Sequence, residues 1–316
     1  MSQDLSVPTR FHAVLHRFAV ILSSCIFLLI IAGALVTSED AGLSVPDWPT
    51  SFGSIYKIPP MVGGVKFEHT HRMIAEGVGF LTILFCIAAF RIDRRRWFRY
   101  LSLAAIGTVI AQGVLGGLTV LFFLPWYISS AHAALGQTFF SIAVLMALYS
   151  GRTWTQSIPE TSVDSGTPST RTLTVLSIVA VYLQLFFGAA FRHSGMSILP
   201  HLVNAVFVSG ILAWTAIRVL SRYGSVVPLR RSASIIMGLL LLQLGFGFAA
   251  YLTRVVWGKN AAQPLPSMVS TTVVHVAIGA LLLAASFVLE EQVRRLLVRE
   301  PAAVTEDTPA RKAISA

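Results

Sequence analysis

Long apolar segments separated by short polar loops run through most of the sequence. Eight of them reach the roughly 20 residues that a helix needs to cross the hydrocarbon core of a bilayer. They lie at residues 14–37, 69–90, 100–124, 128–150, 171–191, 199–220, 232–254 and 268–289. The first is longer than the apolar region of a typical signal peptide, so we expect it to be a retained helix. The pattern predicts an all-α integral membrane protein with eight transmembrane helices.

Composition and charge support the same class. Hydrophobic residues make up 55% of the chain and charged residues 12%, which excludes a soluble globular protein of ordinary composition. The net charge of +10 does not indicate a nucleic-acid partner, because the basic residues alternate between loops instead of forming one patch. If both termini are cytoplasmic, only six of the 24 lysines and arginines face outward, as the positive-inside rule requires.

A polar segment rich in Ser, Thr and Pro, residues 152–170, divides the helices into two sets of four. We expect it to be a cytoplasmic linker between an N-terminal half, residues 1–151, and a C-terminal half, residues 171–299. Residues 300–316 are polar and predict a disordered tail. The halves share weak similarity, best in their fourth helices, where His132-x-Ala134-x-Gly136 matches His275-x-Ala277-x-Gly279. This predicts two pseudo-symmetric four-helix bundles related by an axis along the membrane normal.

Four histidines lie near the first turns of their apolar segments, on one predicted side of the membrane. They are His71, His132, His201 and His275. A polar ring in lipid is costly, and neutral imidazole is well suited to binding a heme iron from both faces. The second and fourth helices of an up-down-up-down bundle are diagonal partners, so each half brings its two histidines to one level. Two bis-histidine heme sites are therefore predicted, one in each half.

Other polar residues near these sites have two interpretations each. Glu68 is three residues before His71 and shares its helix face, which suits either an active-site acid or a water-facing carboxylate near a helix N-terminus. A di-iron site would need a second Glu-x-x-His and two more glutamates, so we set it aside. Arg72 and Glu76 are spaced for an ion pair. Arg192 is either a clamp for heme propionates or an ordinary interfacial arginine.

Taken in order, these residues resemble the heme A synthases of bacteria and mitochondria. The matching segments are Gly42-Leu43-Ser44, Asp47-Trp48-Pro49, Glu68-x-x-His71-Arg72, His132 with Leu135-Gly136, Arg192-His193-Ser194-Gly195, Pro200-His201-Leu202 and His275-x-Ala277-x-Gly279. They span essentially the whole membrane part of the chain.

This resemblance implies a function and a role for each site residue. Heme A synthases oxidise a methyl group of heme O to a formyl group, which makes heme A for cytochrome oxidase. By resemblance, His71 and His132 would hold the substrate heme, and Glu68 would be the essential acid. A permanent heme b would lie between His201 and His275. The spacing alone does not tell which half holds substrate.

The first outer loop departs from the pattern of many bacterial members, which carry a cysteine pair there. Val45 and Ser51 occupy those two positions in this chain, and the only cysteines, Cys25 and Cys86, lie inside apolar segments. A mechanism that passes electrons or heme through such a pair is therefore not expected here.

The predicted protein is thus an oxidoreductase of the bacterial inner membrane, with heme O as substrate and heme b as cofactor. It needs an electron-transfer partner, which the sequence does not identify, and a heme O synthase is a further expected partner. The alternative is a two-heme membrane cytochrome that passes electrons between quinone and an outer partner. Glu68 discriminates between the two, because a pure electron carrier has no need for a carboxylate one turn from a ligand.

Overall fold

The computed structural model describes residues 10–55, 57–156, 161–262 and 264–299. Eight of its helices are long and apolar enough to cross a membrane, which confirms the predicted all-α membrane class. They are α1 (Ala13–Ser38), α2 (Val65–Ile92), α3 (Arg96–Leu121), α4 (Trp126–Ser150), α6 (Thr170–Arg192), α7 (Leu199–Arg222), α8 (Val227–Ala250) with its continuation η1 (Tyr251–Trp257), and α9 (Pro266–Leu296). The expected tail, residues 300–316, lies outside the described residues.

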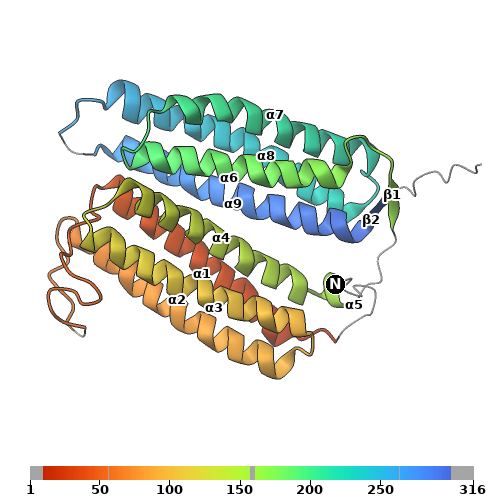
Figure 1. Cartoon of the computed structure of the whole chain (residues 1–316), viewed down its shortest axis with the longest axis horizontal. Helices are drawn as coiled ribbons and strands as arrows, with labels where there is room; N and C mark the ends of the chain where they lie inside the picture. The colour runs from red at the N-terminus through yellow and green to blue at the C-terminus, as the bar shows by residue number, and fades with distance from the viewer. Residues whose placement is uncertain (1–9, 56, 157–160, 263, 300–316) are drawn as a thin grey trace, which may run out of the picture.

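The long helices form two groups of four that lie side by side (Figure 1). Within the first group the main contacts join α1 to α2, α2 to α3, α3 to α4 and α4 to α1. The second group repeats this ring with α6, α7, α8 and α9. Helices α2 and α4 are therefore diagonal partners, as are α7 and α9, which is the arrangement that the histidine positions require.

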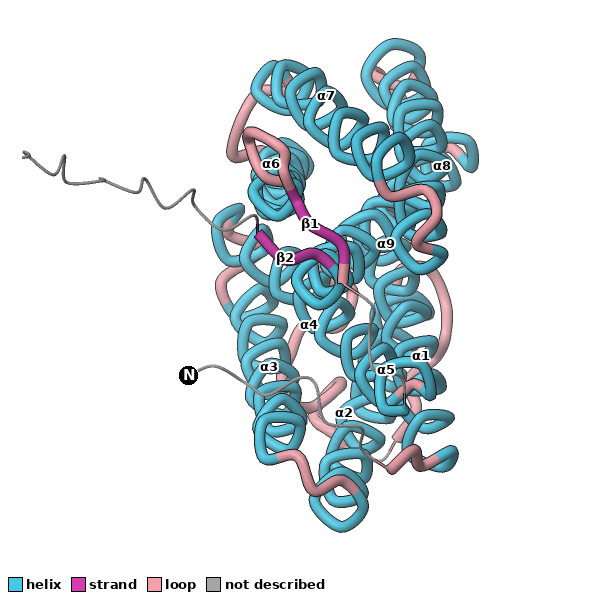
Figure 2. Tube along the Cα trace, turned by 90° about the vertical axis from the view of Figure 1, so that its right-hand side faces the viewer, coloured by secondary structure: helices cyan, strands magenta, loops and turns pink. Residues whose placement is uncertain are grey.

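Helices α1 and α4 of the first group pack against α9, and α4 also contacts α6, so these helices join the two groups. α9 lies near the centre of the end-on view (Figure 2). The core of the first group is built around Phe85, Phe98 and Phe139, all almost fully buried. Ala280 and Ala284 of α9 belong to the same core, so the two groups share apolar packing. Small side chains at these positions let helices approach closely, as is common in membrane proteins.

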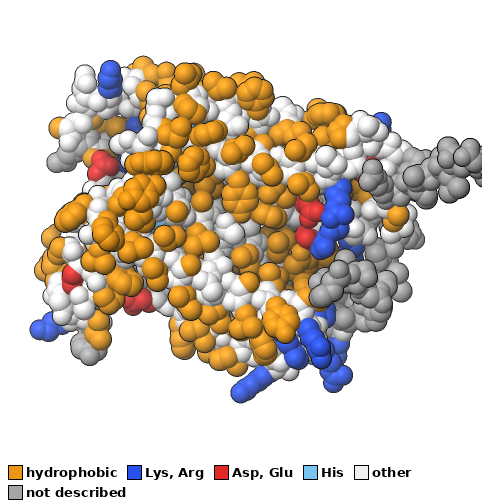
Figure 3. All heavy atoms as spheres, viewed as in Figure 1, with side chains coloured by type: hydrophobic (Ala, Val, Ile, Leu, Met, Phe, Trp, Pro, Cys, Tyr) orange, Lys and Arg blue, Asp and Glu red, His pale blue; other side chains and the backbone are white. Residues whose placement is uncertain are grey.

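The face shown in Figure 3 is largely hydrophobic along the length of the helices, and most charged side chains gather toward its two ends. This distribution fits a helical bundle with its sides in lipid. We call the end that carries residues 39–64 the loop end. The opposite end, with residues 152–169, is the linker end.

The linker is more ordered than a polar connector needs to be. It contains a short helix, α5 (Arg152–Gln156), and a strand, β1 (Ser162–Asp164), which pairs in parallel with β2 (Leu297–Arg299) just after α9. Asp164 accepts hydrogen bonds from the backbone and side chain of Thr170 and from Tyr223. Burial raises the pKa of Asp164, but these hydrogen bonds outweigh it and hold the pKa below its usual value.

Most helix boundaries differ from the sequence prediction by a few residues, and two differences at α9 and α8 stand out. α9 continues to Leu296, beyond the predicted end at residue 289, because charged residues extend it past the apolar segment. There Glu290 lies 3.7 Å from Arg171, and Glu291 pairs with Arg294. α8 changes at Tyr251 into the π-helix η1, which no periodicity in the sequence indicates.

Candidate heme sites

His201 on α7 and His275 on α9 face each other across the second helix group. Their ring centroids are 6.2 Å apart, with an angle of 78° between the ring planes. A metal–imidazole bond of about 2 Å on each side places two ring centroids about 6 Å apart. The pair is therefore spaced to bind one iron from opposite faces of a porphyrin.

Hydrogen bonds at both ring nitrogens orient the rings of His201 and His275. Nδ1 of His201 lies 3.2 Å from the backbone oxygen of Gln184, and Nδ1 of His275 lies 3.2 Å from that of Gln243. In each case the amide nitrogen of the same glutamine side chain lies 3.3 Å from Nε2. An Nδ1–H that donates to a carbonyl leaves the lone pair on Nε2, the tautomer that metal ligation requires.

A glycine on the preceding helix lies against each of the four histidine rings. If that glycine carried a Cβ, the atom would approach the ring closely in every case. The pairs and approaches are Gly33 with His71 (3.0 Å), Gly116 with His132 (3.3 Å), Gly188 with His201 (2.9 Å) and Gly247 with His275 (2.8 Å). The absence of a side chain thus gives each imidazole the space it occupies. Four repeats of one contact support the internal duplication.

The glutamines explain the best match between the halves. Gln112 of α3 lies over Gly136, and Gln243 of α8 lies over Gly279, one turn beyond the histidine of the same helix. A Cβ on these glycines would come within 2.6 and 3.3 Å of the amide nitrogens. The His-x-x-x-Gly spacing therefore accommodates a glutamine from the neighbouring helix. Sequence reasoning gave neither glutamine a role.

The two halves differ beside their first histidine. Gln184 stands four residues before Gly188 and holds His201, whereas Leu29 stands four residues before Gly33. Sequence reasoning missed Gln184, and its one signal was this fixed distance from the matched glycine.

His71 on α2 and His132 on α4 form the corresponding pair in the first helix group. They lie close enough to interact electrostatically. The hydroxyl of Ser129, one turn before His132, and that of Thr272, at the matched position of α9, are buried without a hydrogen-bond partner. Unsatisfied buried polar atoms are costly, so their concentration beside both histidine pairs fits sites built for a bound group.

Glu68 is buried, with 4% of its surface exposed, so its interpretation as a water-facing carboxylate is wrong. One carboxylate oxygen lies 2.7 Å from the guanidinium of Arg72, and the other accepts the backbone N–H of Val45 at 2.8 Å. The predicted pair between Arg72 and Glu76 is also wrong. Glu76 is exposed and makes no ion pair with any residue that the structure describes.

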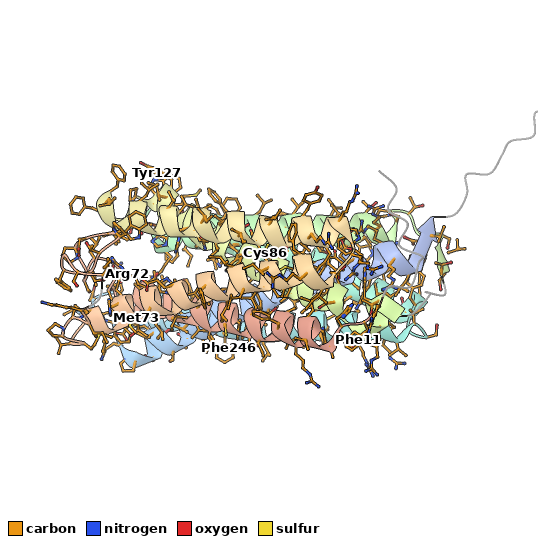
Figure 4. The ribbon with its side chains drawn as sticks, turned by 90° about the horizontal axis from the view of Figure 1, so that it is seen from below. Phe11, Arg72, Met73, Cys86, Tyr127 and Phe246 are labelled. Carbon is orange, nitrogen blue, oxygen red and sulfur yellow. The ribbon has the colours of Figure 1, made fainter. Side chains whose placement is uncertain are left out.

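Arg72 also binds the loop after α1. Its guanidinium donates to the backbone oxygens of Val45, Asp47 and Thr50, and Figure 4 shows it at the loop end of the molecule. These bonds draw the loop over the first turns of α2, next to His71. The buried ion pair between Arg72 and Glu68 thus helps to hold the loop against α2.

Two further contacts hold this loop in place. The hydroxyl of Ser51 lies 3.2 Å from Nδ1 of His69, and the ring of Trp48 packs on Gly117 of α3. Gly117 is next to Gly116, which contacts His132, so the loop reaches α3 beside the second histidine of the first group. Val45 and Ser51 both take part in fixing the loop. The cysteines of the chain are free, and Figure 4 places Cys86 about midway along the helices.

Arg192 is the last residue of α6 and contacts the end of α1. It donates to the backbone oxygen of Thr37 and to Asp40 at 3.0 Å, while its Nε is buried without a partner. The next residue, His193, is half-buried. Burial, together with the nearby Arg192 and His132, lowers the pKa of His193 to about 4. These residues occupy the boundary between the two helix groups at the loop end.

Within the described ranges, His, Cys, Asp and Glu side chains form no group of three or more that could hold a metal ion. A porphyrin supplies most of the ligands of its own iron, so two histidines complete such a site. The spacing of His201 and His275 suits heme ligation rather than a metal bound by protein alone.

Comparison with known proteins gives a consistent set of relatives. Residues 65–199 match the family described as cytochrome oxidase assembly protein. The heme A synthase of Shouchella clausii is 29% identical over 241 residues, which cover 74% of this chain and 75% of that protein. The heme A synthases of Alkalihalophilus pseudofirmus and Symbiobacterium thermophilum are 26% and 30% identical over 58% and 55% of this chain.

The extent of these matches is uneven. The last two alignments span 61% and 58% of the relatives' own lengths. The family match includes Glu68, His71, His132 and Arg192 but ends just before His201.

Proposed function

Because the chain belongs to the heme A synthase family, we propose that it is a membrane oxidoreductase that converts heme O to heme A for cytochrome oxidase. The observation that carries this proposal is the pair of matched bis-histidine sites, only one of which has a buried carboxylate one turn from a ligand. A heme site with such an acid suits the substrate that reacts, and a heme site without one suits a cofactor that stays bound.

We assign the substrate heme to His71 and His132, beside Glu68, and a resident heme b to His201 and His275. The second pair is the more rigidly held, because two glutamines fix both of its rings. Arg192 would bind a propionate of the resident heme through its unpartnered Nε–H. Fixed rings and a cationic clamp favour a group that stays bound.

The reaction is an oxidation of one methyl carbon. Counted with water as the oxygen source, a methyl group and one water give a formyl group, four protons and four electrons. The iron of the bound hemes supplies the redox chemistry, and an electron-transfer partner must take up the electrons. The chain positions the reacting edge between its histidine helices, and the loop tied to Arg72 limits water there.

Glu68 is our candidate for the acid–base or charge-stabilising group. Its carboxylate is a turn from His71 and is kept dry by the loop. Low local dielectric strengthens its effect on charge that develops at the methyl carbon. Losing a positioned acid or base typically costs about 100- to 10,000-fold in rate.

We further propose that the loop end faces outward from the bacterial inner membrane and that both termini are cytoplasmic. The arginine-rich segments 91–99 and 218–231 then face the cytoplasm. Cysteines introduced at Arg95 and Ser51 test this orientation by labelling with an impermeant reagent. If the cysteine at position 95 is labelled from outside and the cysteine at position 51 is not, the protein has the opposite orientation. Heme O entry from lipid next to a heme O synthase fits this placement.

A two-heme cytochrome that only transfers electrons is the second candidate, because paired histidines in both halves suit it equally well. The pigments extracted from the purified protein separate the two functions. Heme b together with heme O or heme A is the expected result. Loading with heme b alone, in cells that make heme O, would favour the cytochrome.

A further inference from the structure

The loop end of α8 has an unusual backbone. Residues Tyr251–Trp257 form the π-helix η1, and Arg254 lies in its middle. π-Helical turns are rare and are found frequently at functional sites, since they change the direction of the side chains that follow. Arg254 had no role in the sequence analysis beyond the count of outward-facing cations.

Arg254 lies next to Arg192 at the boundary between the two helix groups. Its guanidinium donates to the backbone oxygen of Ser38 at 3.3 Å, next to Thr37, whose oxygen Arg192 binds. Arg254 and Arg192 are close enough to interact electrostatically, and both also interact with Asp40. Two arginines of the C-terminal half thus meet at the end of α1.

The charges in this cluster do not balance. Two guanidinium groups face one carboxylate, and the side chain of Asp40 is 61% exposed. The Nε atoms of Arg192 and Arg254 are both buried without a hydrogen-bond partner. A buried donor on a cation is costly to leave unpaired, so the cluster is built to receive an anion.

The cluster adjoins the heme site of the same half. Arg192 is one helical turn beyond Gly188, which contacts His201, and Arg254 follows Gly247, which contacts His275, toward the same end of the molecule. Arginine binds carboxylates through paired, charge-assisted hydrogen bonds. Heme propionates are the carboxylates that a porphyrin between these histidines would present.

The N-terminal half lacks the corresponding pair. Arg192 follows Gly188 by four residues, and Thr37 stands at the same distance from Gly33. Arg254 follows Gly247 by seven residues, and Phe123 stands at the same distance from Gly116. Arg72, the cation beside His71, already binds Glu68 and three backbone oxygens. Among the described residues at the loop end, the buried arginine donors without a partner therefore belong to Arg192 and Arg254, beside the C-terminal site.

We propose that Arg254, placed by the π-helix, binds a propionate of the heme held by His201 and His275, and that with Arg192 it keeps this heme resident. The inference rests on the proposed heme site of that half. It adds a binding residue and a reason why the two halves retain their hemes differently.

The variant Arg254→Gln tests this in the purified holoprotein. Removing one charge-assisted bond should speed the transfer of heme b to apomyoglobin about ten- to a hundredfold. It should also lower the midpoint potential of heme b, because a nearby positive charge favours the reduced state. Arg254→Lys should restore most of the potential. Lys259→Gln removes an exposed cation just after η1, and this control should change neither.

Two further outcomes overturn the inference in distinguishable ways. If Arg254→Gln lowers only the unfolding temperature, with heme transfer and potential unchanged, Arg254 serves the contact with Ser38 alone. The proposed function then stands. If His201→Ala leaves the heme b spectrum unchanged, the C-terminal heme site itself is wrong, and both proposals fail together.

Discussion

The carboxylate of Glu68 is bound on both sides, by Arg72 at 2.7 Å and by the backbone N–H of Val45 at 2.8 Å. A carboxylate in this position holds α2 to the loop that covers it. Any variant of Glu68 therefore changes structure as well as chemistry, and a loss of activity alone does not show that Glu68 takes part in the reaction.

Glu68→Ala should lower the free energy of unfolding by about 3 kcal/mol, because it leaves the charge of Arg72 buried without its partner. The double variant Glu68→Ala/Arg72→Met should recover much of this loss. If Glu68 acts in the reaction, heme A formed per bound heme b stays about 100-fold or more below wild type in both variants. Recovery of turnover in the double variant would instead assign Glu68 to positioning. Glu76→Gln, an exposed carboxylate on the same helix, is the control and should change little.

Loss of a histidine ligand should affect the two hemes separately. His201→Ala and His275→Ala should each remove the low-spin heme b signal while the chain still inserts in the membrane. His71→Ala and His132→Ala should spare that signal but abolish turnover. Optical spectra of the purified variants measure the heme b signal, and the extracted pigments measure turnover. An unchanged spectrum in both C-terminal variants is incompatible with the assignment.

The glycines behind the rings make a prediction that does not depend on activity. Gly247→Ala would place a Cβ 2.8 Å from the ring of His275, so the ring or helix must shift at a cost of about 1–3 kcal/mol. Heme b per protein should fall. Gly238→Ala, on the same helix with open space at its Cβ, should retain full heme and gain about 0.5–1 kcal/mol in stability. Equal heme content in the two variants would argue against the ring contact.

Asp164 predicts a pH dependence at the linker. Its pKa in the folded protein lies below the usual 3.8, so its contribution to stability is present above that pH and is lost as the pH falls through the folded pKa. Asp164→Asn should cost about 1.5–3 kcal/mol near neutral pH, because it weakens hydrogen bonds to a charged acceptor. Thermal unfolding below pH ~4 should then differ less between wild type and variant. A constant difference at all pH values would exclude the charge of Asp164 as the cause.

The helices and the histidine pairs were predictable from the sequence because their signals are local. Hydrophobic length alone fixes which segments span a membrane, and the common depth of His201 and His275 follows from their distance to the helix starts. The matched motifs after His132 and His275 also marked the duplication. Only the structure shows that Gln112 and Gln243 lie over the glycines of these motifs.

The partners of charged residues were not predictable, because spacing allows more than one choice. Arg72 has a glutamate four residues away on each side, and only the loop carbonyls show why it pairs with Glu68 and not Glu76. The position of Arg254 depends on a π-helix and on a hydrogen bond to Ser38, more than 200 residues earlier in the chain. Contacts of this kind leave no local pattern.

The most direct test of the central claim is the conversion of heme O to heme A by this chain in cells that make heme O but have no other heme A synthase. The wild-type chain should yield heme A, identified by the mass of the extracted pigment, in an amount that exceeds its bound heme b. The His71→Ala chain, retaining heme b, should leave heme O unconverted. Full heme b loading of the wild-type chain with heme O unchanged would contradict the synthase function and favour the two-heme cytochrome.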